Sequence, residues 1–169
     1  MNEPSALALF DAGTFIAALL RGDVRHAEAR AMVEAARRGD IFICTTTGIL
    51  SEVYAALTWE KAQPRHPPAK AAAAVRLLVE PPSSIRVISS GLDTILLGLT
   101  LAARHKLTAR RVHDARHAAE ALLAGAQWVY TYDWQDWQAF ERDGLKIAGP
   151  PSTLFRLGRS GAQSDTTRS

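Results

Sequence analysis

Cysteine and long apolar runs are scarce in this sequence of 169 residues, and each absence excludes a class of protein. Because Cys44 is the one cysteine, the chain can form no intramolecular disulfide and has too few thiolates for a cysteine-based zinc site. It lies in the apolar run 41–44, so we expect a small buried residue and not a nucleophile. Apolar stretches such as residues 95–103 stop well short of the roughly 20 residues that a membrane-spanning helix needs. No membrane partner is therefore expected.

Lysine is also scarce, since 16 of the 20 basic residues are arginine. The planar guanidinium group suits bidentate contacts with phosphate, so this composition slightly favours a phosphate-bearing partner. The net charge of +3 adds little to that argument. Near the amino terminus, Glu3 stands where a secretory signal carries basic residues, and we expect a cytoplasmic protein.

The length and composition predict one packed domain. Hydrophobic residues make up 47% of the chain and charged residues 22%, which is close to the average for globular proteins. A chain of 169 residues leaves little room for a second domain. We assign the domain to residues 1–155. Residues 156–169 are rich in serine, glycine, threonine and arginine, and we expect them to form a disordered tail.

Short apolar runs alternate with helical patterns along the domain. The apolar runs predict strands at residues 6–10, 41–44, 85–88, 128–131 and 146–148. Helices are predicted at residues 14–20, 24–38, 68–80, 92–105, 112–123 and 133–142, with a further one that starts after the threonines 45–47 and buries Trp59. In the helix 24–38, the residues expected to face inward are Ala27, Ala31, Val33 and Ala35. This order predicts an α/β fold, with a central parallel sheet of four to five strands and helices on both faces.

Four acidic residues lie where predicted strands end or helices begin: Asp11, Glu52, Asp114 and Asp133. Functional groups of parallel sheets collect beyond the carboxyl ends of the strands, so these acids are expected to converge. Clustered carboxylates repel one another unless a cation neutralises them. Oxygen ligands without thiolates select Mg²⁺ or Mn²⁺, and such an ion can promote attack of water on a phosphodiester.

Each candidate also has an ordinary structural explanation. Asp114 and Asp133 are suited to stabilise helix N-termini, and Asp11 could cap a helix at Thr14. Asp93 follows Ser90 by three residues in a capping-box-like arrangement, and Asp143 is expected to be a surface charge. His113 and His117 have the spacing of a zinc helix, but no glutamate follows His113, and a phosphate contact or a partly buried histidine explains them better.

The segments 9–16, 47–53, 112–119 and 129–137 resemble, in order and spacing, the PIN domain, and most closely PIN ribonucleases of the VapC toxin type. This resemblance implies a Mg²⁺- or Mn²⁺-dependent endoribonuclease, with the acids Asp11, Glu52, Asp114 and Asp133 holding the metal and acting in catalysis. It also implies an RNA substrate, an antitoxin partner that covers the site, and a homodimer. In many relatives a hydroxyl or amide residue follows the first aspartate closely, whereas here a hydroxyl is reached only at Thr14.

Several residues near the acids are candidates for substrate contacts. Thr131 matches the family pattern, and Asp136 and Thr14 are possible outer ligands. Three arginines flank Asp114 and could position an RNA backbone: Arg110, Arg111 and Arg116. Trp134 and Trp137 could stack on an unpaired base, although core packing or an antitoxin groove would explain them equally well.

Two other functions fit parts of the pattern. Asp11 resembles the nucleophilic aspartate of haloacid-dehalogenase-like phosphatases, but Gly13 stands where those enzymes carry a second aspartate. A PIN-like module that binds RNA or protein without cutting is the other alternative, and the residues Ala12 and Gly13 keep it open.

Overall fold

Five parallel strands form the centre of the structure, a computed structural model that describes residues 6–149. Their bounds are β1 Ala8–Phe10, β2 Ile43–Thr46, β3 Arg86–Ile88, β4 Trp128–Tyr130 and β5 Lys146–Ala148. The order in the sheet is β3-β2-β1-β4-β5, and every neighbouring pair is parallel. All three residues of β1 are buried, as expected for a central strand covered on both faces. The predicted fold class is confirmed.

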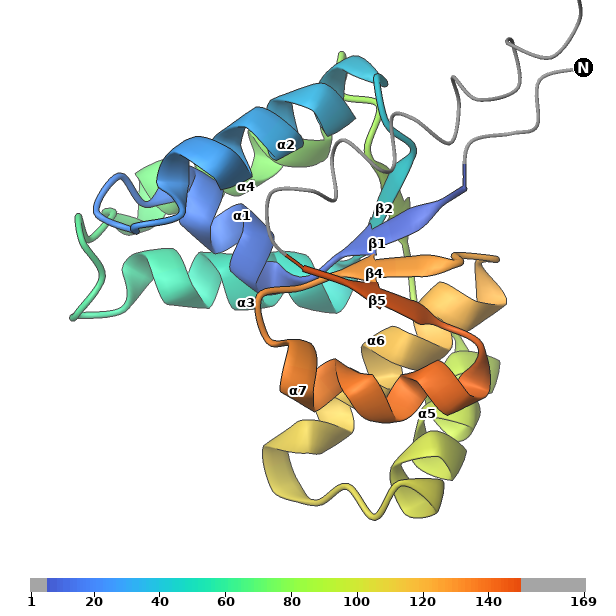
Figure 1. Cartoon of the computed structure of the whole chain (residues 1–169). Coiled ribbons are helices and arrows are strands. Elements are labelled where there is room, and N and C mark those ends of the chain that lie inside the picture. Colours follow the sequence, from blue (N-terminus) through green and yellow to red (C-terminus); the bar gives the residue numbers. More distant parts are fainter. Residues whose placement is uncertain (1–5, 150–169) are drawn as a thin grey trace, which may run out of the picture.

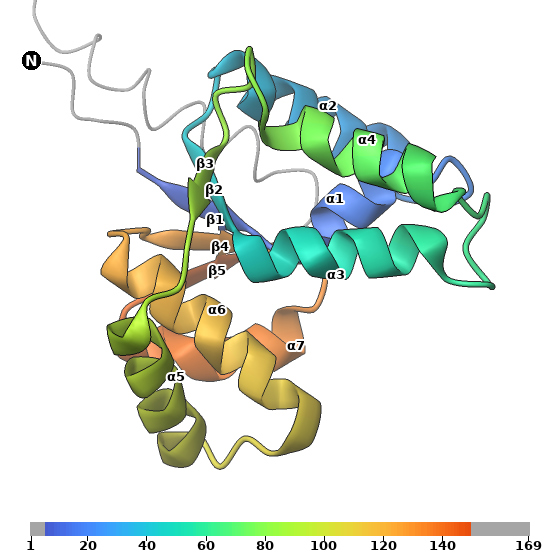
Figure 2. The same ribbon diagram turned by 180° about the vertical axis from the view of Figure 1, so that it is seen from behind.

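Two groups of helices cover the sheet. One group comprises α1 Ala12–Leu19, α2 His26–Arg38, α3 Thr47–Thr58 and α4 Pro68–Val79. The other comprises α5 Leu92–Arg104, α6 Val112–Leu123 and α7 Trp134–Trp137, with the 3-10 turns η1 Ala109–Arg111 and η2 Gln138–Asp143. The groups lie on opposite sides of the sheet (Figures 1 and 2). Within residues 6–149, no helix has the length and apolar character needed to cross a membrane.

Local sequence explains several helix ends. The Thr46 side chain accepts a hydrogen bond from the backbone N–H of Ile49 at 3.0 Å and so caps α3. Pro68 occupies the first turn of α4, where its missing N–H costs nothing. Gly39 ends α2 with a φ of 81°, a conformation that favours glycine.

Three predicted details of the elements are wrong. Helix α1 begins at Ala12 and not at Thr14, because Asp11 caps it directly. In α2, Ala27 and Ala31 are exposed, because the helix turns the larger Met32 into the core together with Ala29, Val33, Ala35 and Ala36. Trp59 follows α3 and is 57% exposed, since the helix ends before it.

Two further predictions about acids are also wrong. The N-cap of α5 is Gly91, which has no side-chain cap in the described structure, so Ser90 and Asp93 form no capping box there. The Asp143 side chain is only 3% exposed, because Arg104 and His105 bind its two carboxylate oxygens. Residues 150–169, which include the predicted tail, lie outside the described residues.

Candidate active site

Asp11 lies at the carboxyl end of the central strand, where it caps α1 and faces the end of β4. Its Oδ1 accepts a hydrogen bond from the Ala12 N–H at 2.8 Å. Its Oδ2 accepts from Thr131 Oγ1 at 2.9 Å and from Trp137 Nε1 at 3.0 Å. Burial raises the pKa of Asp11 in spite of these hydrogen bonds, so the site favours a proton or a cation beside this carboxylate.

Asp114, in the first turn of α6, is close enough to Asp11 for their charges to interact. Burial, followed by the charges of Asp11 and Asp136, raises the pKa of Asp114 to about 6. Arg111 offsets this only weakly, since its Nε lies 3.9 Å from Asp114 Oδ2. The sheet thus brings together two acids that are 103 positions apart in the sequence.

Glu52 reaches the same region from α3 but is held by a histidine. Its Oε1 lies 2.8 Å from Nε2 of His117 on α6. Burial acts to raise the pKa of Glu52, but the hydrogen bond and charge of His117 outweigh it and lower the pKa. The charge of His117 also acts to lower the pKa values of Asp11 and Asp114, although burial outweighs it and both values are raised. Three of the four predicted acids therefore interact with this one ring.

His117 is 1% exposed and is the centre of a buried polar network. Its Nδ1 lies 3.0 Å from Glu120 Oε2 and 3.0 Å from Thr46 Oγ1, and Ser90 donates a hydrogen bond to the fully buried Glu120. Burial acts to lower the pKa of His117, but its bonds to Glu120 and Glu52 raise it to about 9. The ring is therefore protonated at neutral pH and neutralises part of the acid cluster.

Sequence reasoning missed Glu120. Its one available signal is its place in α6, three residues after His117, on a face that is otherwise made of buried alanines. The predicted buried histidine is His117, whereas His113 is exposed.

Asp133 precedes α7 as its N-cap residue, whereas Asp136 lies within the helix, and their charges act on different partners. The backbone N–H of Asp133 donates to Thr131 Oγ1 at 2.9 Å, its side chain is exposed, and its charge acts on Arg25. The charge of Asp136 acts on Asp114 instead. Of these two aspartates, Asp136 therefore has the stronger electrostatic link to the acid pair.

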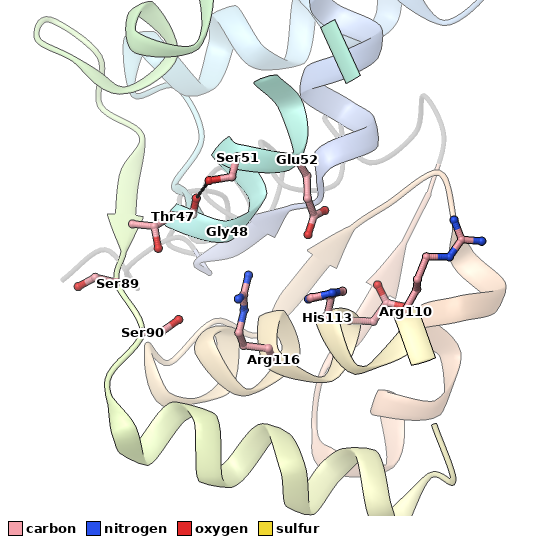
Figure 3. Close-up of a pocket in the computed structure, with 10 residues that line it drawn as sticks. Thr47, Gly48, Ser51, Glu52, Ser89, Ser90, Arg110, His113 and Arg116 are labelled. Carbon is pink, nitrogen blue, oxygen red and sulfur yellow. Dashed lines mark hydrogen bonds between the residues drawn. The ribbon is translucent and has the colours of Figure 1, made fainter. Parts of the chain in front are cut away.

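A pocket of about 770 Å³ opens beside the acids, between α3 and α6 (Figure 3). It is lined by hydroxyl, acidic and basic side chains, namely Thr47, Ser51, Ser89, Ser90, Glu52, Asp114, Arg110, Arg116 and His113, and by Gly48. Glu52 points from α3 and Arg116 from α6 into the space between the two helices. A Cβ at Gly48 would lie 1.8 Å from Arg116 Nη2, so glycine is what admits the guanidinium group.

The remaining predicted residues differ in their exposure and in their contacts. Arg110 is exposed in the pocket, while Arg111 turns away and donates from Nη2 to the Asp136 carbonyl at 2.7 Å. Trp134 is 46% exposed, but Trp137 is 1% exposed and packs on Phe140, so stacking of Trp137 on a base is excluded. Thr14 is fully buried, and its hydroxyl has no hydrogen-bond partner among the described residues.

The carboxylates of Asp11 and Asp114 are suited to a hard divalent cation, although they are fewer than a complete protein ligand set. Within the described part of the chain, no group of three or more acidic, histidine or cysteine side chains is close enough to hold a metal ion. Mg²⁺, however, needs only one or two protein carboxylates, with water and substrate phosphate completing its octahedron. Asp11 and Asp114 supply two, and their raised pKa values show that burial disfavours both anions, with the charges of Asp11 and Asp136 adding to this effect at Asp114.

The family model of the PIN domain matches residues 8–142. This chain therefore belongs to the PIN domain family, as its resemblance suggested. A comparison with curated protein sequences finds no significant match.

Three solved structures are similar in fold. VapC20 of Mycobacterium tuberculosis, a toxin that cleaves the sarcin-ricin loop, is 21% identical, with a TM-score of 0.64 and coverage of 85% of this chain and 99% of that one. A chain of VapBC2 from Rickettsia felis, bound to a promoter DNA fragment, is 13% identical (TM-score 0.57; coverage 85% and 98%). A chain of VapBC-1 from nontypeable Haemophilus influenzae is 13% identical (TM-score 0.56; coverage 85% and 97%).

Proposed function

We propose that this PIN-domain protein is a Mg²⁺- or Mn²⁺-dependent endoribonuclease and the toxin of a toxin–antitoxin pair. The observation that carries the proposal is the meeting of Asp11 and Asp114, each with a raised pKa, at the carboxyl end of the sheet. Such a pair is expected where a cation and a phosphate are to be bound, because within residues 6–149 neither carboxylate is stabilised by an ordinary salt bridge of good geometry. We also propose that the protein acts in the cytoplasm, which agrees with an RNA substrate.

In this proposal, Asp11 and Asp114 hold the ion directly, and Glu52 and Asp133 complete the site directly or through water. When bound, the ion supplies Lewis-acid chemistry: it lowers the pKa of a water and offsets charge on the phosphate. Thr131 fixes the orientation of Asp11 by its hydrogen bond. Asp136 acts as an outer ligand.

Substrate contacts in this proposal come from one arginine in η1 and one in α6. Arg110 and Arg116 line the pocket beside Asp114, where their guanidinium groups bind backbone phosphates. The four hydroxyl side chains of the same pocket provide hydrogen-bonding groups for a base or ribose.

Protein partners are proposed from the fold likeness and from exposed apolar surface. Similar chains occur in the VapBC2 and VapBC-1 structures, which supports an antitoxin partner. A groove of about 260 Å³ between α1, α2 and α4 exposes Leu77 to 61% and offers such a partner an apolar surface. On α5, Leu92, Leu96 and Leu99 are each more than half exposed, which supports a homodimer.

The test is cleavage of an end-labelled RNA by the purified protein with Mg²⁺, with Mn²⁺ and with EDTA. We expect cleavage with either ion, none with EDTA, and a loss of at least about 100-fold in Asp114→Asn. Asp93→Asn is the matched control, because Asp93 is an exposed acid in the first turn of α5. Added Mg²⁺ should also raise the melting temperature of the wild type but not of Asp114→Asn.

Two results would count against this proposal. Binding of RNA without cleavage under any metal would favour the non-catalytic module, for which the pairing of Glu52 with His117 is the supporting observation. A phosphate analogue trapped on Asp11 would favour the phosphatase.

A further inference from the structure

A second pocket, of about 730 Å³, lies between the end of α5 and the helical turns after β4. Four cationic side chains line it, and Glu141 is the one acid among its lining residues. The cations are Arg104, Lys106, Arg111 and Arg142. Gln135 and Gln138 add amide groups that can donate hydrogen bonds. Of these residues, Arg111 alone was predicted from the sequence to have a functional role.

The pocket is joined to the acid pair through Arg111. This side chain lines the pocket, while its Nη2 donates to the Asp136 carbonyl and its Nε lies 3.9 Å from Asp114 Oδ2. Arg111 Nε is buried and has no hydrogen-bond partner within residues 6–149. A strand whose phosphate sits at Asp11 and Asp114 would therefore pass Arg111 on its way into the second pocket.

The rim of the pocket is fixed by buried contacts and by its backbone. Arg104 and His105 both bind Asp143, which ties the end of α5 to the turn before β5. In the connection that follows, Lys106 has a φ of 54° and Ala109 a φ of 49°. Residues other than glycine rarely adopt this left-handed backbone conformation. Such conformations persist only where the surroundings impose them, and they are frequent at binding sites. The loop therefore holds the positively charged Lys106 in a fixed backbone conformation.

We propose that this second pocket binds backbone phosphates of the RNA strand on one side of the scissile bond. The inference rests on the proposed nuclease function and adds to it a named binding surface. Arg104 is paired with Asp143 and Arg111 lies near Asp114, but Lys106 and Arg142 form no ion pair among residues 6–149, and their two charges favour an anion in the pocket. The connection through Arg111 places that anion next to the phosphate to be cut. Contacts of this kind set affinity and register without reading sequence.

The test is the double variant Lys106→Gln/Arg142→Gln. Both side chains are exposed and neither forms an ion pair in the part of the chain that is described, so the fold should be unaffected. The matched control is Arg30→Gln/Lys70→Gln, which removes the same two charges from exposed positions on α2 and α4, on the opposite side of the sheet (Figure 1).

Binding of a fluorescein-labelled single-stranded RNA is measured in EDTA over a series of salt concentrations. We expect the double variant to bind about tenfold more weakly than the control and its log–log salt slope to be smaller by about 1.4, since each lost phosphate contact contributes about 0.7 for single strands. Each single variant should give about half of this change in slope. With Mg²⁺, kcat/KM for cleavage should fall mainly through a higher KM.

The outcomes separate the two proposals. If the wild type cleaves RNA and the double variant matches the control in affinity and slope, the second pocket does not bind RNA, and the nuclease function stands. If the wild type neither binds nor cleaves RNA, both proposals fail. A loss of affinity with an unchanged slope would also overturn the inference, because phosphate contacts must reduce the salt dependence.

Discussion

Asp114 belongs to the candidate active site, and its ionised carboxylate destabilises the folded state. Its pKa of about 6, against an ordinary 3.8, means that the folded state holds its proton more tightly than the unfolded state. The ionised carboxylate therefore destabilises the fold, and stability falls as the pH rises from about 4 through 6. Natural enzymes commonly retain such a cost where the charge is needed.

We therefore predict that Asp114→Asn, in EDTA at about pH 7.5, is more stable than the wild type by about 1–2 kcal/mol, a value reduced for solvent screening of this partly exposed group. The gain should shrink toward zero near pH 4, where the wild-type carboxyl is protonated. Thermal or urea unfolding at both pH values measures it, with Asp93→Asn as the control. An equal gain at both pH values would show that repulsion is not its cause.

The same substitution at Asp11 is a poorer test. Both carboxylate oxygens of Asp11 accept hydrogen bonds, from Ala12 on one side and from Thr131 and Trp137 on the other. An asparagine would turn its NH₂ group toward one of these donors, which costs a hydrogen bond and mixes two effects.

At the scale of the element, the start of α3 depends on the absence of a side chain. A Cβ at Gly48 would lie 1.8 Å from Arg116 Nη2 and 2.8 Å from Cε1 of His117. The end of the arginine can move, but the His117 ring is held on both sides by Glu52 and Glu120. The close approach of α3 to α6 is thus set by this glycine.

Gly48→Ala is expected to destabilise the protein by about 1–2 kcal/mol, because overpacking outweighs the gain in helix propensity. Gly13→Ala is the matched control, since Gly13 is also the second residue of its helix and its nearest neighbour to an added Cβ is 3.9 Å away. That variant should be neutral or slightly stabilising. Urea unfolding compares the two, and equal effects would contradict the steric argument.

At the scale of the whole molecule, His117 links segments from both helical layers. Thr46 and Glu52 come from the end of β2 and from α3, Glu120 from α6, and Ser90 from the connection between β3 and α5. One protonated ring therefore compensates two glutamates, of which Glu120 is fully buried.

The pH dependence of this network has a definite sign. The folded-state pKa of His117, about 9, lies above its ordinary 6.5, so its contribution to stability is complete below about pH 6.5 and is lost as the pH rises through 9. The pKa values of Glu52 and Glu120 are lowered, so their contributions are lost as the pH falls below about 4.5. Stabilisation by the network is greatest between these limits.

We predict that the wild type loses more stability than His117→Gln between about pH 7.5 and 10, while the variant is the less stable protein at about pH 6. Unfolding by urea across this range measures the difference. His113→Gln, an exposed histidine one turn earlier on the same helix, should follow the wild type. Parallel curves for wild type and His117→Gln would contradict the protonation of His117.

The local sequence determined the elements and their order. Apolar runs and capping residues such as Thr46, Gly39 and Pro68 act over a few positions, so the parallel α/β fold and the strands followed by Asp11 and Asp133 could be read from them. The same reasoning misplaced Ala27 and Ala31, because the rotation of α2 about its axis depends on what packs against it.

The pairing of side chains was decided by the tertiary structure. Trp137 donates to Asp11 across 126 positions, Glu52 meets His117 across 65, and Asp143 is buried by Arg104 from 39 positions away. No local pattern encodes such contacts, because they depend on strand order and on the angle at which each helix crosses the sheet. The sequence by itself therefore determined which acids stand at the ends of strands. The tertiary structure decided which of these acids interact with one another or with a cationic side chain, because only the folded sheet brings its carboxyl ends together.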